Sequence, residues 1–265
     1  MPKIPTRDIM TYYEEQGSGE PLLMIMGLGG DLQAWLRVAP VLARQYRVIT
    51  FDNRGAGRTS APDKPYSIAG MADDAAALLE ALGIGKAHVL GFSMGGYIAQ
   101  ELALQHPGLV EKLILLSTAC SIEGYIRSVV LGMQQVRRTN ISREGWVRYQ
   151  APYLYSPDLL DDAGRYEAAI HANLANQWPQ SDHAFVRQCQ AILAWDAKDR
   201  VGGIKNQALV AVGKDDVLVP PRNSELLAKR LPNASLKTLS GAHLGALENP
   251  KEYVETFLAF LGGGG

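Results

Sequence analysis

The sequence predicts an α/β fold in which a mostly parallel sheet is flanked by helices and interrupted by a helical insertion. The first observation is a series of short, nearly continuous apolar runs, which is typical of strands covered on both faces. The second is that segments with helical spacing separate these runs, as expected when parallel strands are joined by right-handed crossovers. The third is that this alternation stops between about residues 121 and 200.

The predicted strands and helices follow in chain order from these patterns. Apolar runs predict strands at 22–26, 46–51, 87–92, 112–116 and 208–212, and a weaker run predicts one at 235–239. Helical spacing predicts helices around 35–42, 71–82, 98–104 and 226–231, the second ended by Gly83 and the third by Pro107. Asn249, Pro250 and Glu252 form a capping-box pattern at the start of a final helix.

The stretch from 121 to 200 contains no convincing strand run and is rich in aromatic residues. It holds three of the four tryptophans and several tyrosines, and its spacing indicates several helices. We therefore expect residues 1–120 and 201–265 to form a core domain. Residues 121–200 are expected to form a helical cap, or lid, inserted into it.

Composition and charge exclude several classes of protein. With 265 residues, 47% of them apolar and 20% charged, the chain can bury a sizeable core and is not a disordered protein. The net charge of −1 provides no basic surface for nucleic acid or for an anionic membrane. No apolar run is long enough to span a bilayer, and the N-terminus has no secretory pattern, so we expect a cytoplasmic protein. Cys120 and Cys189 are expected to be buried free thiols.

The most informative motif is Gly91-Phe92-Ser93-Met94-Gly95, which follows a predicted strand and opens a predicted helix. A serine at the tip of such a sharp turn exposes its hydroxyl, and the two glycines leave room for the strained backbone. The N–H of Met94 then points outward at the start of the helix, where positive dipole gathers. Ser93 is therefore predicted to be a nucleophile.

A serine hydroxyl needs a base near neutral pH, and His243 is the predicted one among five histidines. It lies in a loop of small residues between the last predicted strand and the last predicted helix. The other four have structural interpretations: His88 lies within a strand, His106 at a helix end, and His171 and His183 on the insertion, where they are expected at the surface, with a place in the pocket as the alternative for one of them.

The carboxylate that orients the base should follow another strand, between the serine and the histidine in chain order. The sequence Gly213-Lys214-Asp215-Asp216 follows the predicted strand at 208–212 and offers two aspartates. Asp216 is favoured because the turn swings it back over the sheet, with Asp215 as the alternative. The developing oxyanion also needs donors, for which the Met94 and Leu28 N–H groups are the candidates.

Together these motifs resemble the α/β-hydrolase superfamily, and the resemblance covers nearly the whole chain. Asp52-Asn53-Arg54-Gly55-Ala56-Gly57-Arg58-Thr59 looks like the family's D-x-R-G-x-G-x-[ST] stretch, which implies a structural rather than catalytic Arg54. Residues 190–204 look like the cap-to-core return of the esterase and enol-lactonase branch. Residues 26–31, which we call the oxyanion loop, carry Leu28. Met26 stands where relatives usually have a histidine that anchors this loop.

We therefore expect an α/β-hydrolase fold and a serine hydrolase that cleaves small or medium carboxylic esters or lactones through an acyl-enzyme. No metal or organic cofactor is expected, no nucleic-acid or membrane partner is expected, and no oligomer is indicated. The substrate pocket is predicted to be apolar and covered by the insertion, with candidates Tyr125, Trp146, Tyr149, Tyr153 and Trp178.

Two other functions are compatible with the same motifs. One is a meta-cleavage C–C hydrolase, whose anionic substrates call for a basic pocket group, for which Arg127 and Arg148 are candidates. The other is a non-catalytic sensor that binds a small ligand on the same fold.

Overall fold

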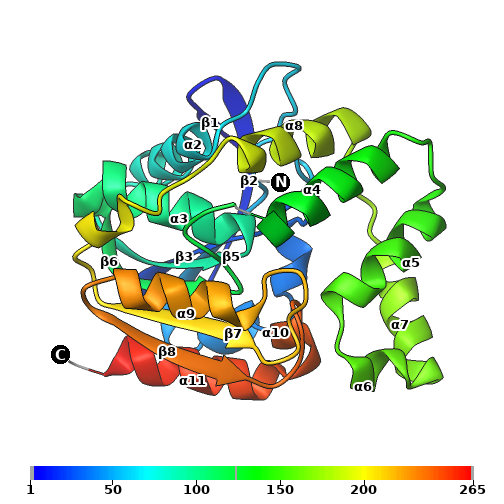
Figure 1. Ribbon diagram of the computed structural model, residues 1–265. Coiled ribbons are helices and arrows are strands. Elements are labelled where there is room, and N and C mark those ends of the chain that lie inside the picture. Colours follow the sequence, from blue (N-terminus) through cyan, green and yellow to red (C-terminus); the bar gives the residue numbers. More distant parts are fainter. Residues whose placement is uncertain (1–2, 123, 264–265) are drawn as a thin grey trace.

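An eight-stranded sheet forms the centre of the protein, as a computed structural model that describes residues 3–122 and 124–263 shows (Figure 1). The strands are β1 (Lys3–Thr6), β2 (Ile9–Gln16), β3 (Glu20–Ile25), β4 (Tyr46–Phe51), β5 (Ala87–Phe92), β6 (Val110–Leu116), β7 (Ala208–Gly213) and β8 (Ala234–Leu239). Their order across the sheet is β1-β2-β4-β3-β5-β6-β7-β8. All six predicted strands are present, and β3 to β8 run parallel to one another.

The sequence patterns did not predict β1 and β2, which pair antiparallel with each other and, through β2, with β4. Both strands carry exposed or half-buried positions among their buried ones, because they lie at the edge of the sheet. The search for continuous apolar runs therefore passed over them.

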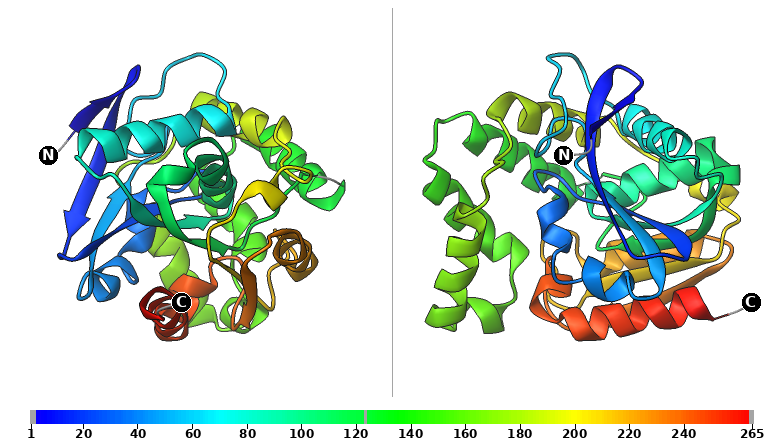
Figure 2. Two further views of the ribbon diagram at one scale, coloured as in Figure 1. Left: turned by 90° about the vertical axis from the view of Figure 1, so that its left-hand side faces the viewer. Right: turned by 180° about the vertical axis from the view of Figure 1, so that it is seen from behind.

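Helices cover both faces of the sheet, which explains why its central strands are apolar throughout. Leu22 and Met24 of β3 pack with α1 (Ala39–Leu42) and α11 (Pro250–Gly262). The alternate residues Leu23 and Ile25 pack on the other face with α2 (Ile68–Ala81), α3 (Met94–Gln105) and α9 (Pro221–Arg230). Figure 2 shows these two layers of helices from the side.

Two predicted helix features differ from what the structure contains. The helix predicted around 35–42 is a short 3₁₀ turn, Leu32–Trp35, followed by α1. Pro40 explains the break, because proline is tolerated in the first turn of a helix and not in its interior. Asn249 does precede α11, but its side chain makes no capping hydrogen bond, and Glu252 instead accepts from the backbone N–H of Ser240.

The predicted insertion is occupied by helices α4 (Gly124–Arg137), α5 (Arg143–Leu154), α6 (Pro157–Leu160), α7 (Ala163–Leu174) and α8 (Asp182–Leu193), which we call the α4–α8 segment. It leaves the sheet after β6 and returns before β7, and α5 to α7 project to one side in Figure 1. The division of the chain into two domains at residues 121 and 200 stays a prediction.

The chain returns from α8 to the core through contacts with α3. The Trp195 ring stacks on Tyr97 at 4.5 Å between ring centroids, and its indole N–H donates to Glu101 at 2.8 Å. Arg200 also pairs with this buried carboxylate. The return segment is therefore held by both apolar and charged contacts.

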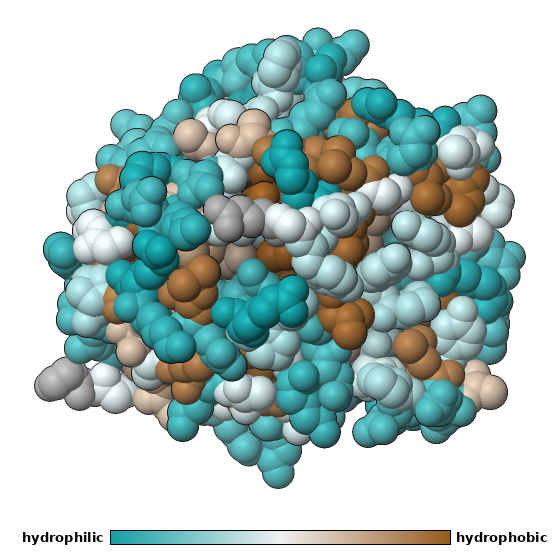
Figure 3. Space-filling model, viewed as in Figure 1, coloured by the Kyte–Doolittle hydropathy of each residue, from teal (hydrophilic) through white to brown (hydrophobic). Residues whose placement is uncertain are grey.

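Between residues 3 and 122 and between 124 and 263, none of the helices has the length and apolarity needed to cross a bilayer. The face shown in Figure 3 is mostly polar, with apolar side chains in separate patches, one of them between α4 and α8. Cys120 and Cys189 are buried free thiols, as predicted. Burial raises the pKa of Cys189 to about 12.

Candidate active site

Ser93 lies at the tip of the turn from β5 to α3 with a backbone strain that its neighbours accommodate. Its φ of 54° and ψ of −119° are unusual for a residue with a side chain. A Cβ on Gly91 would lie 2.4 Å from the Gly95 carbonyl oxygen, and one on Gly95 would lie 2.1 Å from that of Ile25. Only glycine fits at either position, which is the reason for the spacing of the motif.

The core of the fold fixes this turn through backbone hydrogen bonds to the end of β6. The Ser93 N–H donates to the Leu116 carbonyl at 2.9 Å, and the Thr118 hydroxyl donates to the Ser93 carbonyl at 2.9 Å. These bonds offset the cost of the strained conformation, because they satisfy polar groups that are buried.

His243 connects the serine to a carboxylate. Its Nε2 lies 3.0 Å from Ser93 Oγ, and its Nδ1 lies 2.8 Å from Asp216 Oδ2. An imidazole with its proton on Nδ1 donates to Asp216 and leaves Nε2 free to accept the serine proton. The side chains of His243 and Asp216 are 2% and 0% exposed, so bulk water does not compete for these bonds.

The turn after β7 aims Asp216, and not Asp215, at the histidine. Asp216 Oδ1 accepts from the backbone N–H groups of Leu218 and Val219, at 3.0 and 2.8 Å, which leaves Oδ2 for the imidazole. Asp215 instead lies near Lys214, with 4.0 Å between Oδ2 and Nζ. Of the two aspartates, Asp216 therefore contacts His243, and Asp215 contacts Lys214.

The loop that carries His243 is fixed from two sides. The Ala242 N–H donates to Glu248 of α10 (Gly245–Glu248) at 3.2 Å. The Leu244 N–H donates to the carbonyl of Leu154, at the end of α5, at 2.9 Å. The α4–α8 segment therefore contributes to the position of the histidine loop.

The two candidate oxyanion donors belong to segments that adjoin Ser93: Met94 follows it in the chain, and Leu28 lies in the loop after β3. A Cβ on Gly27 would lie 2.9 Å from the Ser93 Cβ, so the loop that carries Leu28 passes directly against the serine. Across residues 3–122 and 124–263, no carbonyl or side chain accepts a hydrogen bond from the Leu28 or Met94 N–H. Two unpartnered amides beside the hydroxyl suit the binding of an oxyanion.

The buried Met26 side chain packs against Gly30 of the oxyanion loop, and groups from other segments hold the loop by hydrogen bonds. The Asn53 side-chain amide donates to the Met26 carbonyl at 2.7 Å, and the Leu32 N–H donates to Asp52 at 2.8 Å. The Gly29 N–H donates to Gln188 of α8 at 3.2 Å. The loop is therefore held by side chains from the 52–59 loop and from α8.

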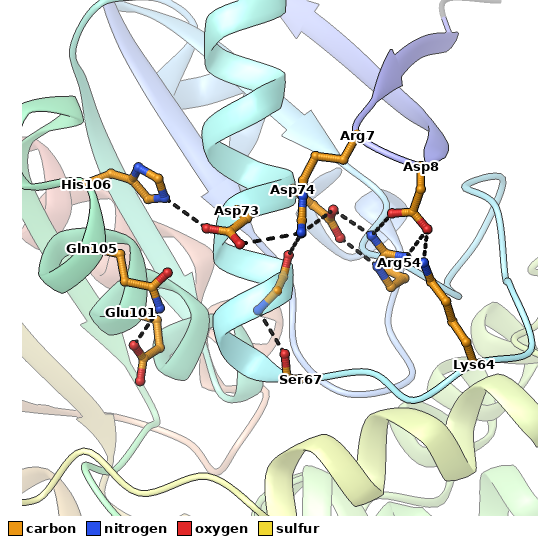
Figure 4. A network of polar contacts seen from close by, with 11 residues as sticks. Arg7, Asp8, Arg54, Lys64, Ser67, Asp73, Asp74, Glu101, Gln105 and His106 are labelled. Carbon is orange, nitrogen blue, oxygen red and sulfur yellow. Dashed lines mark hydrogen bonds and ion pairs between the residues drawn. The ribbon is translucent and has the colours of Figure 1, made fainter.

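Arg54 is buried in an ion-pair network with Asp8 and Asp74 (Figure 4). Its guanidinium bonds both carboxylate oxygens of Asp74, at 2.7 and 2.8 Å, and Asp8 lies on its other side at 2.8 Å. Burial alone lowers the pKa of Arg54, but these carboxylates outweigh burial and raise it. The arginine ties the 52–59 loop to α2 and to the β1–β2 turn, in agreement with a structural role.

The remaining histidines have partners other than Ser93. His88 contacts Glu20 at 3.2 Å, and His106 contacts Asp73 at 3.0 Å (Figure 4). His183 contacts the Ala61 carbonyl at 3.2 Å, and His171 is exposed. His243 is the histidine that the structure brings to the serine.

Three of the five predicted pocket residues lie together on α5. The Trp146 ring stacks on Tyr149 with 5.7 Å between centroids, and Tyr149 is 5.9 Å from Tyr153. Trp146 also packs edge-on against Phe185 of α8, whose ring reaches Gly29 of the oxyanion loop. Tyr125 and Trp178 are not part of this group, and both are about two-fifths exposed. The aromatic strip of α5 thus connects to the oxyanion loop through Phe185.

The basic residues predicted for an anionic substrate are engaged elsewhere. Arg127 is exposed and donates to the Leu193 carbonyl at 3.0 Å. Arg148 pairs with Glu144 at 2.9 Å and with Glu167 at 2.8 Å. In the part of the chain that the structure describes, no group of three or more His, Cys, Asp or Glu side chains is arranged to hold a metal ion.

Gln188, Asn53 and Thr118 support the site, and the sequence analysis did not identify them. Gln188 had a detectable signal, because it is a polar residue on the otherwise apolar face of α8. Asn53 and Thr118 had none, since each acts on a backbone carbonyl that is distant in the sequence.

Comparisons with known proteins agree with this architecture. The alpha/beta hydrolase fold family matches residues 20–250. RutD of Azorhizobium caulinodans, a proposed carbamate hydrolase, is 32% identical over 99% of this chain and 98% of its own length. The enol-lactonase of Burkholderia xenovorans LB400 superposes with a TM-score of 0.91 at 25% identity, covering 99% of this chain and all of that one. A thermophilic esterase from Thermogutta terrifontis gives 0.86 at 25% identity, covering 98% and 97%.

Proposed function

The chain belongs to the α/β-hydrolase fold family, and we propose that it is a serine hydrolase that cleaves small or medium carboxylic esters or lactones. The observation that carries this proposal is the line of hydrogen bonds from Ser93 through His243 to Asp216. A hydroxyl, a base and a buried carboxylate in this order are the parts that activate a serine nucleophile.

In the proposed reaction, Ser93 Oγ attacks the carbonyl carbon while His243 Nε2 takes the hydroxyl proton. Asp216 holds the imidazole in the required tautomer and stabilises its positive charge without taking the proton. The carbonyl oxygen becomes an oxyanion, which the Leu28 and Met94 N–H groups bind. The histidine then gives its proton to the leaving alkoxide, so that an alcohol departs and an acyl-serine remains.

Water completes the cycle by the same steps. His243 removes a proton from a water molecule, which attacks the acyl-serine carbonyl and forms a second oxyanion. Collapse of this intermediate breaks the bond to Ser93 Oγ, and the histidine returns the proton to the serine. The products are a carboxylic acid and an alcohol, or a hydroxy acid when the substrate is a lactone.

The surroundings of the site support an uncharged, partly aromatic substrate. The α5 strip of Trp146, Tyr149 and Tyr153 offers apolar rings, and burial raises the pKa of Tyr149, which keeps its hydroxyl neutral. The similar proteins named as an enol-lactonase, an esterase and a proposed carbamate hydrolase share attack on a carbonyl carbon as their common chemistry.

The test is turnover of a series of aryl esters, lactones and carbamates by the wild type and by Ser93→Ala. We expect hydrolysis of at least one class by the wild type and a loss of about 10³-fold or more in kcat for the variant. Equal rates for both proteins would reject Ser93 as the nucleophile. Binding of the series without turnover would favour the sensor, and cleavage of ring-cleavage diketones alone would favour the C–C hydrolase.

A further inference from the structure

Gln188 is a fully buried amide at the contact between α8 and two loops of the core. Its Oε1 accepts from the Gly29 N–H at 3.2 Å, and its Nε2 donates to the Arg54 carbonyl at 2.9 Å. Its neighbours on the buried side of α8 are apolar and include Phe185, Cys189 and Ile192. A glutamine at such a position orders the backbone groups that it bonds, because a buried amide is costly without partners.

The hydrogen bond to Gly29 acts on the peptide that follows a candidate oxyanion donor. Gly27, before Leu28, is pressed against Ser93 and permits no side chain. Gly29, after Leu28, has a φ of 75°, which glycine adopts without steric cost, and it can also take other φ values as easily. The peptide before Leu28 is held by contact with the serine and by a hydrogen bond from the Gly30 N–H to the Gly27 carbonyl at 3.3 Å. The peptide after Leu28 is held by Gln188.

The Nε2 of Gln188 bonds a loop that ion pairs hold to the rest of the core. The Arg54 carbonyl belongs to the residue whose guanidinium is bonded to Asp74 and Asp8 (Figure 4). The next carbonyl, that of Gly55, accepts from Gln180 at 2.9 Å, just before α8 begins. Gln188 thus links the 52–59 loop to the oxyanion loop by one hydrogen bond to each.

We infer that Gln188 is a positioning residue for the oxyanion hole. Through it, the orientation of the Leu28 N–H depends on the position of α8 against the core. This inference rests on the proposed serine hydrolase function. Gln188 does not touch the reacting atoms and acts through the Gly29 peptide. Loss of its acceptor frees Gly29 to rotate and leaves a donor without a partner beside the hole.

The first experiment compares Gln188→Leu with Gln190→Leu, which changes an exposed glutamine on the same helix. We expect Gln188→Leu to lower kcat about 10- to 100-fold, with KM changed less than about 3-fold, since a small displacement of an oxyanion donor acts on the transition state. Gln190→Leu is expected to match the wild type. Thermal unfolding of each variant checks that the fold is retained.

A second variant, Gln188→Glu, tests the same residue through a pH profile. A protonated carboxylic acid can accept from Gly29 and donate to the Arg54 carbonyl, as the amide does. Once ionised, it cannot donate, and it places negative charge beside the oxyanion. The ratio of its kcat to that of the wild type is therefore expected to fall as pH rises through the carboxyl pKa, which burial raises.

The outcomes separate this inference from the proposed function. A Gln188→Leu protein that unfolds at a lower temperature but keeps wild-type kcat would mean a purely structural role and overturn the inference, even with Ser93→Ala inactive. If Gln188→Leu does not fold, a flat ratio near one for Gln188→Glu across pH overturns it. Full activity of Ser93→Ala would overturn the proposed function and this inference with it.

Discussion

The two sides of the candidate site are held in different ways. Ser93, Asp216 and His243 each follow a strand of the central sheet, and hydrogen bonds within the core fix the first two. The oxyanion loop also follows a strand, β3, but it depends on partners from elsewhere, among them Gln188 and Asn176 in and before α8. Ser93 and Asp216 (the sheet side) are thus held within the core, whereas the oxyanion loop (the shared side) and, through one hydrogen bond from Leu244 to Leu154, the histidine loop also depend on the α4–α8 segment.

This difference matches the roles that the proposed reaction gives to the two sides of the site. In the proposed reaction, the groups that move protons need fixed distances, and the carboxyl ends of parallel strands provide them. The loop proposed to bind the substrate's oxygen lies where the α4–α8 segment touches the core. Substitutions on the sheet side are therefore expected to abolish the chemistry, and those on the shared side to reduce it by degrees.

The largest effect is expected on the sheet side, from Asp216→Asn. The amide cannot hold the histidine in the tautomer that accepts the serine proton, so kcat should fall about 10³- to 10⁴-fold with little loss of stability. Steady-state kinetics on the best substrate of the panel measures this. Asp215→Asn is the matched control and should stay within about 2-fold, as a change outside the hydrogen-bond line does. A similar loss in both variants would contradict the assignment.

A smaller effect is expected on the shared side, from Asn176→Ala. The Asn176 amide donates at 2.8 Å to Asp31, at the end of the oxyanion loop, and accepts at 3.1 Å from Gln33, just beyond it. Because these bonds lie farther from Leu28 than that of Gln188, we expect a kcat reduction of about 2- to 5-fold, a fraction of what removal of an oxyanion donor costs.

The control for this experiment is Asn173→Ala, which changes an exposed asparagine of α7. Steady-state assays with both variants and the wild type compare their kcat values. An Asn176→Ala protein with unaltered kcat, alongside an impaired Gln188→Leu, would restrict the shared support to α8 itself.

The smallest effect on catalysis is expected from Glu101→Gln, which weakens the return of the α4–α8 segment to the core. Burial raises the pKa of Glu101, but bonds from Arg200, Gln105 and Trp195 outweigh this and lower it overall. The ionised form therefore stabilises the fold above the unfolded pKa, and this stabilisation is lost as pH falls through the lowered folded pKa. At neutral pH we expect a loss of about 1–3 kcal/mol in unfolding free energy.

Urea unfolding across pH measures this effect, with the exposed Glu225→Gln as control. The difference between the wild type and Glu101→Gln should shrink as pH falls below the unfolded carboxyl pKa and through the lowered folded pKa, because the folded carboxylate then loses its charge. A difference that grows toward acid pH would show that the charge of Glu101 does not stabilise the return segment.

The sequence was sufficient for features that depend on neighbours along the chain. The central strands were predictable because both of their faces are buried, and the turn at Ser93 because its glycines are required two residues away on each side. The turn at Asp216 was predictable for the same local reason, and its contact with His243 was found as expected.

Features that depend on distant segments were beyond the sequence patterns. The edge strands β1 and β2 lack continuous apolar runs, and the helix near residue 40 is divided by a proline whose effect depends on where the helix begins. Gln188 reaches a glycine 159 residues away, which no local spacing indicates. Of the five pocket candidates, three have rings that pack together along α5, whereas Tyr125 and Trp178 are exposed. The sequence pattern did not distinguish the two groups.

The most direct measurement is the mass of the protein after brief mixing with an activated aryl ester and quenching in acid. The account predicts an increase equal to one acyl group, located by peptide mapping on Ser93 and absent from Ser93→Ala. Release of the phenol with the acyl group on another residue, or an equal mass increase in Ser93→Ala, would contradict it.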